Sequence, residues 1–214
     1  MLLCFDYDGV IVDSFAVLLS YCQQAQRTLG AGRPPQAEDL QTIESLTFDA
    51  LGAHIGLERD ACRRFAAAVF ALQRDQGWPA VPFDGIGEVF AELAAAHDIV
   101  VVTASESATV SRSLAAHGLR AHVAQVLGGE SGLGKAQRIE QAVQALGHAR
   151  DGTWMIGDAI SDIREGKRAG VRTAAVTWGY QPEPVLAAER PDRIVRRVAD
   201  LREIGDSSPV SIEN

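Results

Sequence analysis

The strongest constraint on the fold is a series of short apolar runs that alternate with segments of helical periodicity. The runs are Leu2–Phe5, Ile99–Val102, Val123–Leu127, Thr153–Ile156 and Thr173–Val176, with Arg193–Val195 as a candidate sixth. They need no polar face, as expected of strands buried on both sides of a parallel sheet. Helical patterns lie between them at Gly85–His97, Ser107–His117, Ala136–Leu146 and Ile160–Ala169. This alternation predicts an α/β fold, a doubly wound parallel sheet with right-handed crossovers.

One long stretch interrupts the alternation. From Ser14 to about Trp78 the periodicity is helical only, and the helices expected there are Phe15–Leu29, Ala37–Leu46, Phe48–Ile55 and Arg59–Gln76. A chain of 214 residues suits one domain or two small ones. We therefore expect an α/β core of residues 1–13 and 80–214 and a helical insert of residues 14–79, with Gly77–Pro82 as the return linker.

Charge and composition exclude several classes of partner. The formal net charge is −8, so the chain has no electrostatic reason to bind nucleic acid or an anionic membrane surface. No run approaches the ~18 apolar residues that span a bilayer, and the first residues lack the basic region of a signal peptide. The three cysteines form no CxxC pair, which argues against a disulfide framework or a zinc site. We expect a cytoplasmic protein.

The first candidate site residues follow the first predicted strand. In an open parallel sheet, ligands bind beyond the carboxyl ends of the strands, which is where Asp6 and Asp8 lie. Acids at i and i+2 of an extended chain point the same way and repel each other, so a metal or a shared proton is expected between them. Gly9 permits a tight turn and offers an N–H group to an anion. Turn or helix-cap roles would explain the same residues less specifically.

Three further strand or helix ends carry polar residues. Thr103 follows a buried strand, and its hydroxyl and the amides after it, beginning with Ala104, can donate to a phosphoryl oxygen. Lys135 stands at a helix start, where a cation is unfavourable for the helix dipole, so another reason for its charge is expected. Asp158 follows the fourth run, and Asp162 lies four residues on, so that both can converge on one cation.

Each of these features also has a structural explanation when taken alone. Ser105 or Ser107 can cap a helix, Lys135 can be a solvated surface residue, and Asp158 can be an N-cap. The combination is harder to explain in this way, because independent caps would have to coincide at every strand end on one edge of the sheet. The set therefore predicts a shared site for phosphate and Mg²⁺, at which the carboxylates of Asp6, Asp8 and Asp158 converge on one cation.

Four motifs occur in the order that a known family shows. They are FDYDGVIVDS (Phe5–Ser14), VVTAS, GLGK and GDAISD. With them the chain resembles the haloacid dehalogenase superfamily on its phosphatase side, from Met1 to about Arg202, and the insert lies where that family carries a cap domain. The stretch Gly157–Tyr180 is similar to the phosphoglycolate phosphatase-like group. Tyr7 replaces the usual Phe, and Ala136-Gln137 replaces the proline-rich stretch that often follows the lysine.

The resemblance implies a fold and a reaction. The fold is a Rossmann-like core with a small helical cap, and the reaction is Mg²⁺-dependent hydrolysis of a small phosphorylated metabolite, with phosphoglycolate as a candidate. Asp6 would attack phosphorus and form an aspartyl-phosphate. Asp8 would protonate the leaving alcohol and later activate water.

The resemblance also implies the ligands of the metal and the phosphate. Mg²⁺ would be bound by Asp6, the Asp8 carbonyl and Asp158, with help from Asp162. Thr103 and the nearby amides would hold the phosphoryl oxygens, and Lys135 would balance the charge between Asp6 and the phosphate.

Other activities of the same superfamily fit these residues less well. A dehalogenase protonates no alkoxide and needs no Mg²⁺, so Asp8 and Asp158 argue against it. A phosphonatase needs a lysine in the cap, and residues 14–78 contain none. A phosphosugar mutase needs a cap that grips a second phosphate. The stretch Thr42–Ala50 has Glu44 and Asp49 but no Arg, which argues against it. The mutase and a catalytically silent phosphate-binding or regulatory protein are retained as alternatives.

Overall fold

The computed structural model describes residues 1–204, so the end of the predicted core, residues 205–214, lies outside the described part of the chain. The strands are β1 (Leu2–Phe5), β2 (Val12–Asp13), β3 (Val81–Pro82), β4 (Asp98–Val102), β5 (Gln125–Leu127), β6 (Thr153–Gly157), β7 (Arg172–Val176) and β8 (Arg193–Val195). The α-helices are α1 (Phe15–Leu29), α2 (Ala37–Thr42), α3 (Phe48–His54), α4 (Arg59–Gln76), α5 (Ile86–Ala94), α6 (Ser107–Ala116), α7 (Lys135–Leu146), α8 (Ile160–Arg168) and α9 (Glu183–Ala188).

Six strands form one parallel sheet in the order β5-β4-β1-β6-β7-β8. Strand β1 lies in the middle, and its last residue, Phe5, is paired with Val101 of β4 and with Ile156 of β6. The chain proceeds outward from β1 through β4 and β5, and then on the other side through β6, β7 and β8. The strand order therefore reverses at β1, which is where α/β sheets form their binding crevice.

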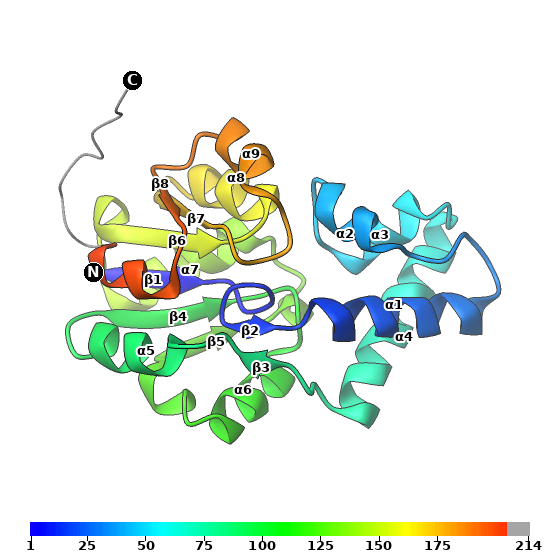
Figure 1. Cartoon of the computed structure of the whole chain (residues 1–214), viewed down its shortest axis with the longest axis horizontal. Helices are drawn as coiled ribbons and strands as arrows, with labels where there is room; N and C mark the ends of the chain where they lie inside the picture. The colour runs from blue at the N-terminus through cyan, green and yellow to red at the C-terminus, as the bar shows by residue number, and fades with distance from the viewer. Residues whose placement is uncertain (205–214) are drawn as a thin grey trace.

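Helices cover both faces of the sheet (Figure 1). Along β1, the side chains of Leu3 and Phe5 join one buried cluster with α5 and α6, whereas Leu2 and Cys4 join another with α7. Helix α8 contacts β6 and β7 and packs beside α7. Because successive side chains of a strand point to opposite faces, a strand buried on both sides has to be apolar throughout. The predicted doubly wound α/β fold is confirmed.

Helices α1–α4 lie beyond the carboxyl ends of the strands (Figure 1). Helix α4 contacts both α1 and α3. Two connections join this helical insert to the sheet, and they run side by side, because β2 and β3 form a short antiparallel pair, with Val12 opposite Pro82. The insert is therefore placed over the edge of the sheet at which strand-end residues gather.

Most predicted elements are present, with differences at their ends and in two additions. Helix α2 ends at Thr42 and not at Leu46, because Ile43 is extended and its carbonyl oxygen accepts a hydrogen bond from Gln181, 138 residues away. Thr47 then starts α3 by accepting from Ala50 N at 3.3 Å. Helix α9 and the β2–β3 pair had no clear sequence signal. Among the described residues, no helix combines the length and apolar character that crossing a lipid bilayer requires.

Candidate active site at the carboxyl ends of the strands

Asp6 follows the last residue of β1 and lies at the centre of the site. Its backbone N–H donates to Ile156 O at 2.8 Å, which extends the β1–β6 pairing by one residue. Its Oδ1 accepts from Tyr7 N at 2.8 Å, and its Oδ2 lies 3.1 Å from Lys135 Nζ. Burial raises the pKa of Asp6 to about 7, although the Lys135 charge acts in the opposite direction. Asp6 is thus a fixed carboxylate with one oxygen facing a cation.

The loop after Asp6 depends on a glycine. Gly9 has φ +78°, and a Cβ atom built there would lie 2.1 Å from Asp158 Oδ2. Only glycine lets the loop come this close to Asp158. The Gly9 N–H donates to Val12 O at 2.9 Å. The predicted use of Gly9 as a phosphate donor is therefore corrected: its amide is taken up within the loop, and its contribution is close approach.

Three carboxylates gather at the ends of β1 and β6. Asp6, Asp158 and Asp162 each offer an oxygen, and these oxygens lie within 4.8 Å of one another. Asp162 Oδ1 accepts from Lys135 Nζ at 2.5 Å, and its Oδ2 accepts from Ala159 N at 3.1 Å, at the start of α8. One lysine therefore faces two of the three acids.

Asp158 is the least compensated of the three acids. It is 1% exposed, and its Oδ2 accepts from Tyr180 N at 2.6 Å. Its Oδ1 is buried without a hydrogen-bond partner among the described residues. Burial, and then the charges of Asp162 and Asp6, raise its pKa well above the ordinary value. A buried oxygen of this kind beside other carboxylates fits a hard divalent cation such as Mg²⁺, which prefers oxygen ligands.

The Asp8 side chain does not join this cluster, which corrects the expectation that the carboxylates of Asp6, Asp8 and Asp158 converge. Asp8 Oδ1 accepts from Ser14 Oγ at 2.7 Å and from Trp78 Nε1 at 3.2 Å, and its Oδ2 accepts from Ser105 Oγ at 2.8 Å. The rule that residues i and i+2 point the same way holds only while the strand continues, and β1 ends at Phe5.

The environment of Asp8 raises the pKa of its carboxyl. Burial raises the pKa of Asp8, while the hydrogen bonds from Ser14, Ser105 and Trp78 partly oppose the shift. Asp8 and Asp6 are thus two neighbouring acids in different surroundings, one among neutral donors and one beside a lysine. Such a difference is typical of a pair with separate roles.

Thr103 and Ala104 lie at the end of β4. Thr103 is fully buried, and its Oγ1 accepts from Ser105 N at 3.0 Å, which leaves the hydroxyl hydrogen to be donated. Ala104 lines the same pocket as Asp6 and Lys135. The predicted capping role of Ser105 is wrong, because Glu106 is the N-cap residue of α6 and the Ser105 hydroxyl binds Asp8.

A pocket of about 450 Å³ opens beside Asp6. One wall is formed by the segment between α2 and α3, with Glu44, Ser45, Leu46 and Thr47. The other wall is formed by the start of α7 and by α8, with Gly134, Lys135, Ser161, Arg164, Glu165 and Arg168. An ion pair crosses it, with Arg164 Nη1 at 2.9 Å from Glu44 Oε2. The insert and the sheet edge therefore enclose the site together.

Several polar residues of the site were not among the predicted site residues. Ser14, Trp78 and Ser105 surround Asp8, and Tyr180 donates to Asp158 through its N–H and contacts Ser14 Oγ through its hydroxyl at 2.8 Å. Ser14 and Tyr180 stand at the ends of the two stretches that carried the resemblance. Trp78 had no signal beyond its place in the return linker.

Comparison with known proteins gives one family model and several similar chains. A family model described as haloacid dehalogenase-like hydrolase matches residues 3–176. The chain is 25% identical over 201 residues to a phosphoglycolate phosphatase of Synechococcus elongatus, covering 92% of this chain and 93% of that protein. It is 30% identical over 210 residues to the "Probable phosphatase IndB" of Dickeya dadantii, covering 94% and 91%. A haloacid dehalogenase-like hydrolase of Streptococcus pneumoniae superposes with a TM-score of 0.81 at 21% identity, covering 94% and 95%.

Proposed function

The chain belongs to the haloacid dehalogenase-like hydrolases, since that family's model covers most of its length, and from this premise we propose that it hydrolyses a small phosphate monoester. The observation that carries the proposal is the surroundings of Asp6. One of its oxygens lies 3.1 Å from Lys135 Nζ, and two further carboxylates lie within 4.8 Å. A carboxylate nucleophile, a cation and a set of metal ligands are what phosphoryl transfer requires, because the reaction depends on positioning and charge stabilisation.

The first step forms an aspartyl-phosphate. A carboxylate oxygen of Asp6 bonds to phosphorus while the bond from phosphorus to the ester oxygen breaks. The Asp8 carboxyl gives its proton to that ester oxygen, so the leaving group departs as a neutral alcohol. The raised pKa of Asp8 supports the role, because a carboxyl that holds its proton more tightly is an acid at higher pH.

The second step returns the enzyme to its starting state. Water bonds to phosphorus as its proton passes to the Asp8 carboxylate, and the bond between phosphorus and Asp6 breaks. Lys135 and the donors at Thr103 and Ala104 hold the phosphoryl oxygens in both steps. Asp6, Asp158, Asp162 and the Asp8 carbonyl would hold Mg²⁺, which would neutralise charge on Asp6 and the phosphoryl group.

We further propose that residues 14–79 form a cap domain that encloses the substrate. The segment from Glu44 to Thr47 supports this, because it lines the pocket that Asp6 and Lys135 also line. A cap in this position would exclude water and select the leaving group.

The substrate class is proposed as a small phosphorylated metabolite, in line with the phosphoglycolate phosphatase relative. The mutase alternative is less well supported, because the insert contributes Glu44 to the pocket while both arginines of its wall belong to α8. A phosphate-binding or regulatory protein remains the non-enzymatic alternative. The cytoplasmic location stays a prediction.

The proposal is tested by phosphate release from a panel of sugar, carboxylic acid and aryl phosphates, with Mg²⁺ and with EDTA. We expect turnover of at least one small ester with Mg²⁺ and its loss with EDTA. A folded chain that binds inorganic phosphate but turns over no ester of the panel would instead support the regulatory alternative.

A further inference from the structure

Both connections between the helical insert and the sheet place a hydrogen-bond donor on the same oxygen. Ser14 lies immediately before α1, and Trp78 lies two residues after α4. Ser14 Oγ donates to Asp8 Oδ1 at 2.7 Å, and Trp78 Nε1 donates to the same atom at 3.2 Å. Since β2 and β3 bring the two connections together, the Asp8 carboxyl lies at the base of the insert.

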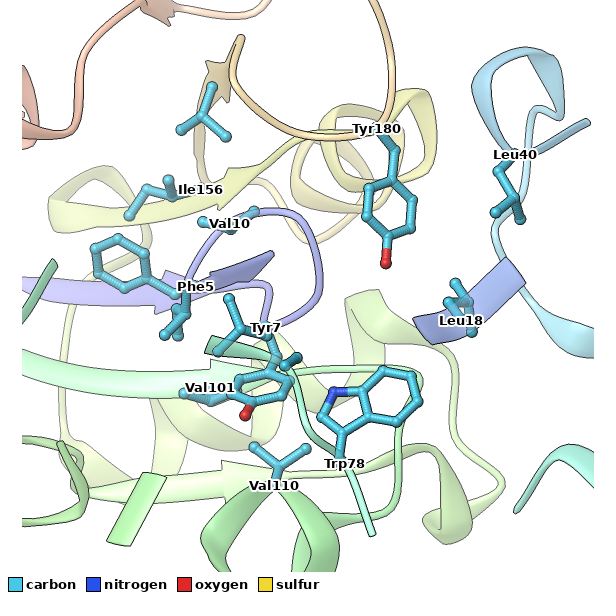
Figure 2. Close-up of a cluster of buried hydrophobic side chains, with 14 of the residues drawn as sticks. Phe5, Tyr7, Val10, Leu18, Leu40, Trp78, Val101, Val110, Ile156 and Tyr180 are labelled. Carbon is cyan, nitrogen blue, oxygen red and sulfur yellow. The ribbon is translucent and has the colours of Figure 1, made fainter. Parts of the chain in front are cut away.

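The Trp78 ring is held by the insert. Trp78 is 8% exposed, and its ring centroid lies 5.7 Å from that of Tyr21 on α1. The Tyr21 hydroxyl donates to Gly77 O at 3.0 Å, which fixes the residue before the tryptophan. In Figure 2 the Tyr180 ring lies above the Trp78 ring, and the Tyr180 hydroxyl points down toward the side of Trp78. The indole thus packs on the insert while its N–H binds a core residue.

The two oxygens of Asp8 have different kinds of partner. The indole N–H can only donate, so Oδ1 has to accept. The Ser105 hydroxyl, which binds Oδ2 at 2.8 Å, can rotate and either donate or accept. The donors from both connections of the insert therefore converge on Oδ1, whereas the donor to Oδ2 is Ser105 of the core.

We infer that Trp78 is a positioning residue that, with Ser14, holds Asp8 Oδ1 and ties the orientation of this carboxyl to the placement of the insert. This inference rests on the proposed function, because it concerns how the proposed general acid is held toward the leaving group. Ser14 supports it: the residue occupies the N-cap of α1, yet its side chain makes no capping hydrogen bond and binds Asp8 and Tyr180 instead.

The test compares leaving groups in the Trp78→Phe variant, which keeps an aromatic ring beside Tyr21 and removes the N–H. An alkyl phosphate needs a proton on its leaving oxygen, whereas 4-nitrophenyl phosphate releases a stable anion. We expect kcat/KM to fall about tenfold for the alkyl ester, as for loss of one hydrogen bond to a reacting group, and less than about twofold for the aryl ester. The ratio of the two values does not depend on the fraction of protein that is folded.

Trp178→Phe is the matched control. Its Nε1 donates to Val10 O at 3.2 Å, the same length as the Trp78 bond, but to a backbone carbonyl and not to Asp8. We expect this variant to change both esters by the same factor. Ser14→Ala removes the other donor to Oδ1 and should repeat the selective loss on the alkyl ester.

The outcomes separate the inference from the proposed function. A wild-type chain that releases phosphate, with equal losses on both esters in Trp78→Phe, overturns the inference and leaves the proposed function standing. A selective loss in Trp178→Phe also overturns it. A wild-type chain with no turnover of either ester overturns the proposed function itself, and the inference with it.

Discussion

The backbone N–H of Tyr180 donates to Asp158 Oδ2 at 2.6 Å, while the other oxygen of that carboxylate is buried without a hydrogen-bond partner among residues 1–204. This bond from the loop after β7 thus fixes the position of Oδ2 and the orientation of the Asp158 carboxyl. One oxygen of this carboxyl lies within 4.8 Å of oxygens of Asp6 and Asp162. A buried carboxyl oxygen left without a partner is costly, which supports the proposed Mg²⁺ site.

Mg²⁺ should therefore stabilise the fold through Asp158. A ligand at one hundred times its dissociation constant adds about 2.7 kcal/mol to the free energy of unfolding, which raises the melting temperature. We expect this rise in the wild-type chain and not in Asp158→Asn, measured by thermal unfolding with and without Mg²⁺. Asp151→Asn, at an exposed position, is the control and should respond like the wild type. An equal rise in Asp158→Asn would remove Asp158 from the metal site.

Asp6→Asn should abolish turnover and leave the fold intact. The substitution removes the nucleophile, and an amide of nearly the same shape keeps the acceptor for Tyr7 N. The measurement is phosphate release together with the far-UV circular dichroism spectrum. Asp13→Asn is a control at an exposed position seven residues on. Turnover retained in Asp6→Asn would refute the nucleophile assignment.

The sequence predicted the sheet well because each strand of the six contains a short apolar run. Leu2–Phe5 and Arg193–Val195 match β1 and β8 in full, and Phe15–Leu29 and Arg59–Gln76 match α1 and α4. These elements follow from local periodicity and from glycines that end helices. The early end of α2 does not, since it depends on Gln181, which lies far away in the sequence.

The site was predictable as a set of residues but not in its orientations. Asp6, Lys135, Asp158 and Asp162 come together because each follows a strand or starts a helix at one edge of the sheet. The orientation of Asp8 could not be predicted, because its partner Trp78 is 70 residues away. Contacts of this separation leave no periodic trace in a single sequence.

Asp8→Asn should slow turnover by roughly 10²–10⁴-fold, the usual contribution of a positioned general acid or base. The amide can still accept from Trp78 and Ser14, but it has no acid proton to give to the leaving oxygen. Steady-state kinetics on an alkyl phosphate measures the effect. A rate equal to that of the wild type would show that Asp8 has no catalytic part.

The two lysines of the chain form a natural pair of test positions. Lys135 lies between Asp6 and Asp162 with only 12% of its side chain exposed, whereas Lys167 is exposed and donates to Glu189 O. Removing one partner of a buried ion pair costs on the order of 3–5 kcal/mol, so Lys135→Gln should lower stability markedly and abolish most activity. Lys167→Gln should stay within about 0.5 kcal/mol of the wild type. Urea unfolding and phosphate release measure both, and similar losses in the two variants would contradict a special role for Lys135.

Asp39 gives the fold a pH-dependent contribution outside the active site. The Arg33 guanidinium donates to both of its oxygens at 2.6 Å, and Gln36 N and His54 Nε2 add further contacts at 2.7 and 3.0 Å. These contacts hold the pKa of Asp39 well below its usual range, and the hydrogen bonds from Arg33 have the largest effect. The ionised form of Asp39 is therefore more favourable in the folded chain than in the unfolded chain. Stability from this group is present above the ordinary pKa of about 3.9 and is lost as the pH falls toward the lower folded value.

Asp39→Asn should consequently lower the free energy of unfolding at pH 7 by about 1 kcal/mol, a modest value because the Arg33 side chain is 46% exposed. The difference from the wild type should shrink as the pH is lowered from 5 to 3, because Asp39 of the unfolded wild-type chain then binds a proton that the folded chain has to release. Urea unfolding at pH 7, 5 and 3 measures it. Asp60→Asn, which breaks an exposed ion pair with Arg63, is the control and should change stability by less than about 0.5 kcal/mol at every pH. A difference for Asp39→Asn that stays constant from pH 7 to pH 3 would show that its stabilisation does not come from the ionised carboxylate.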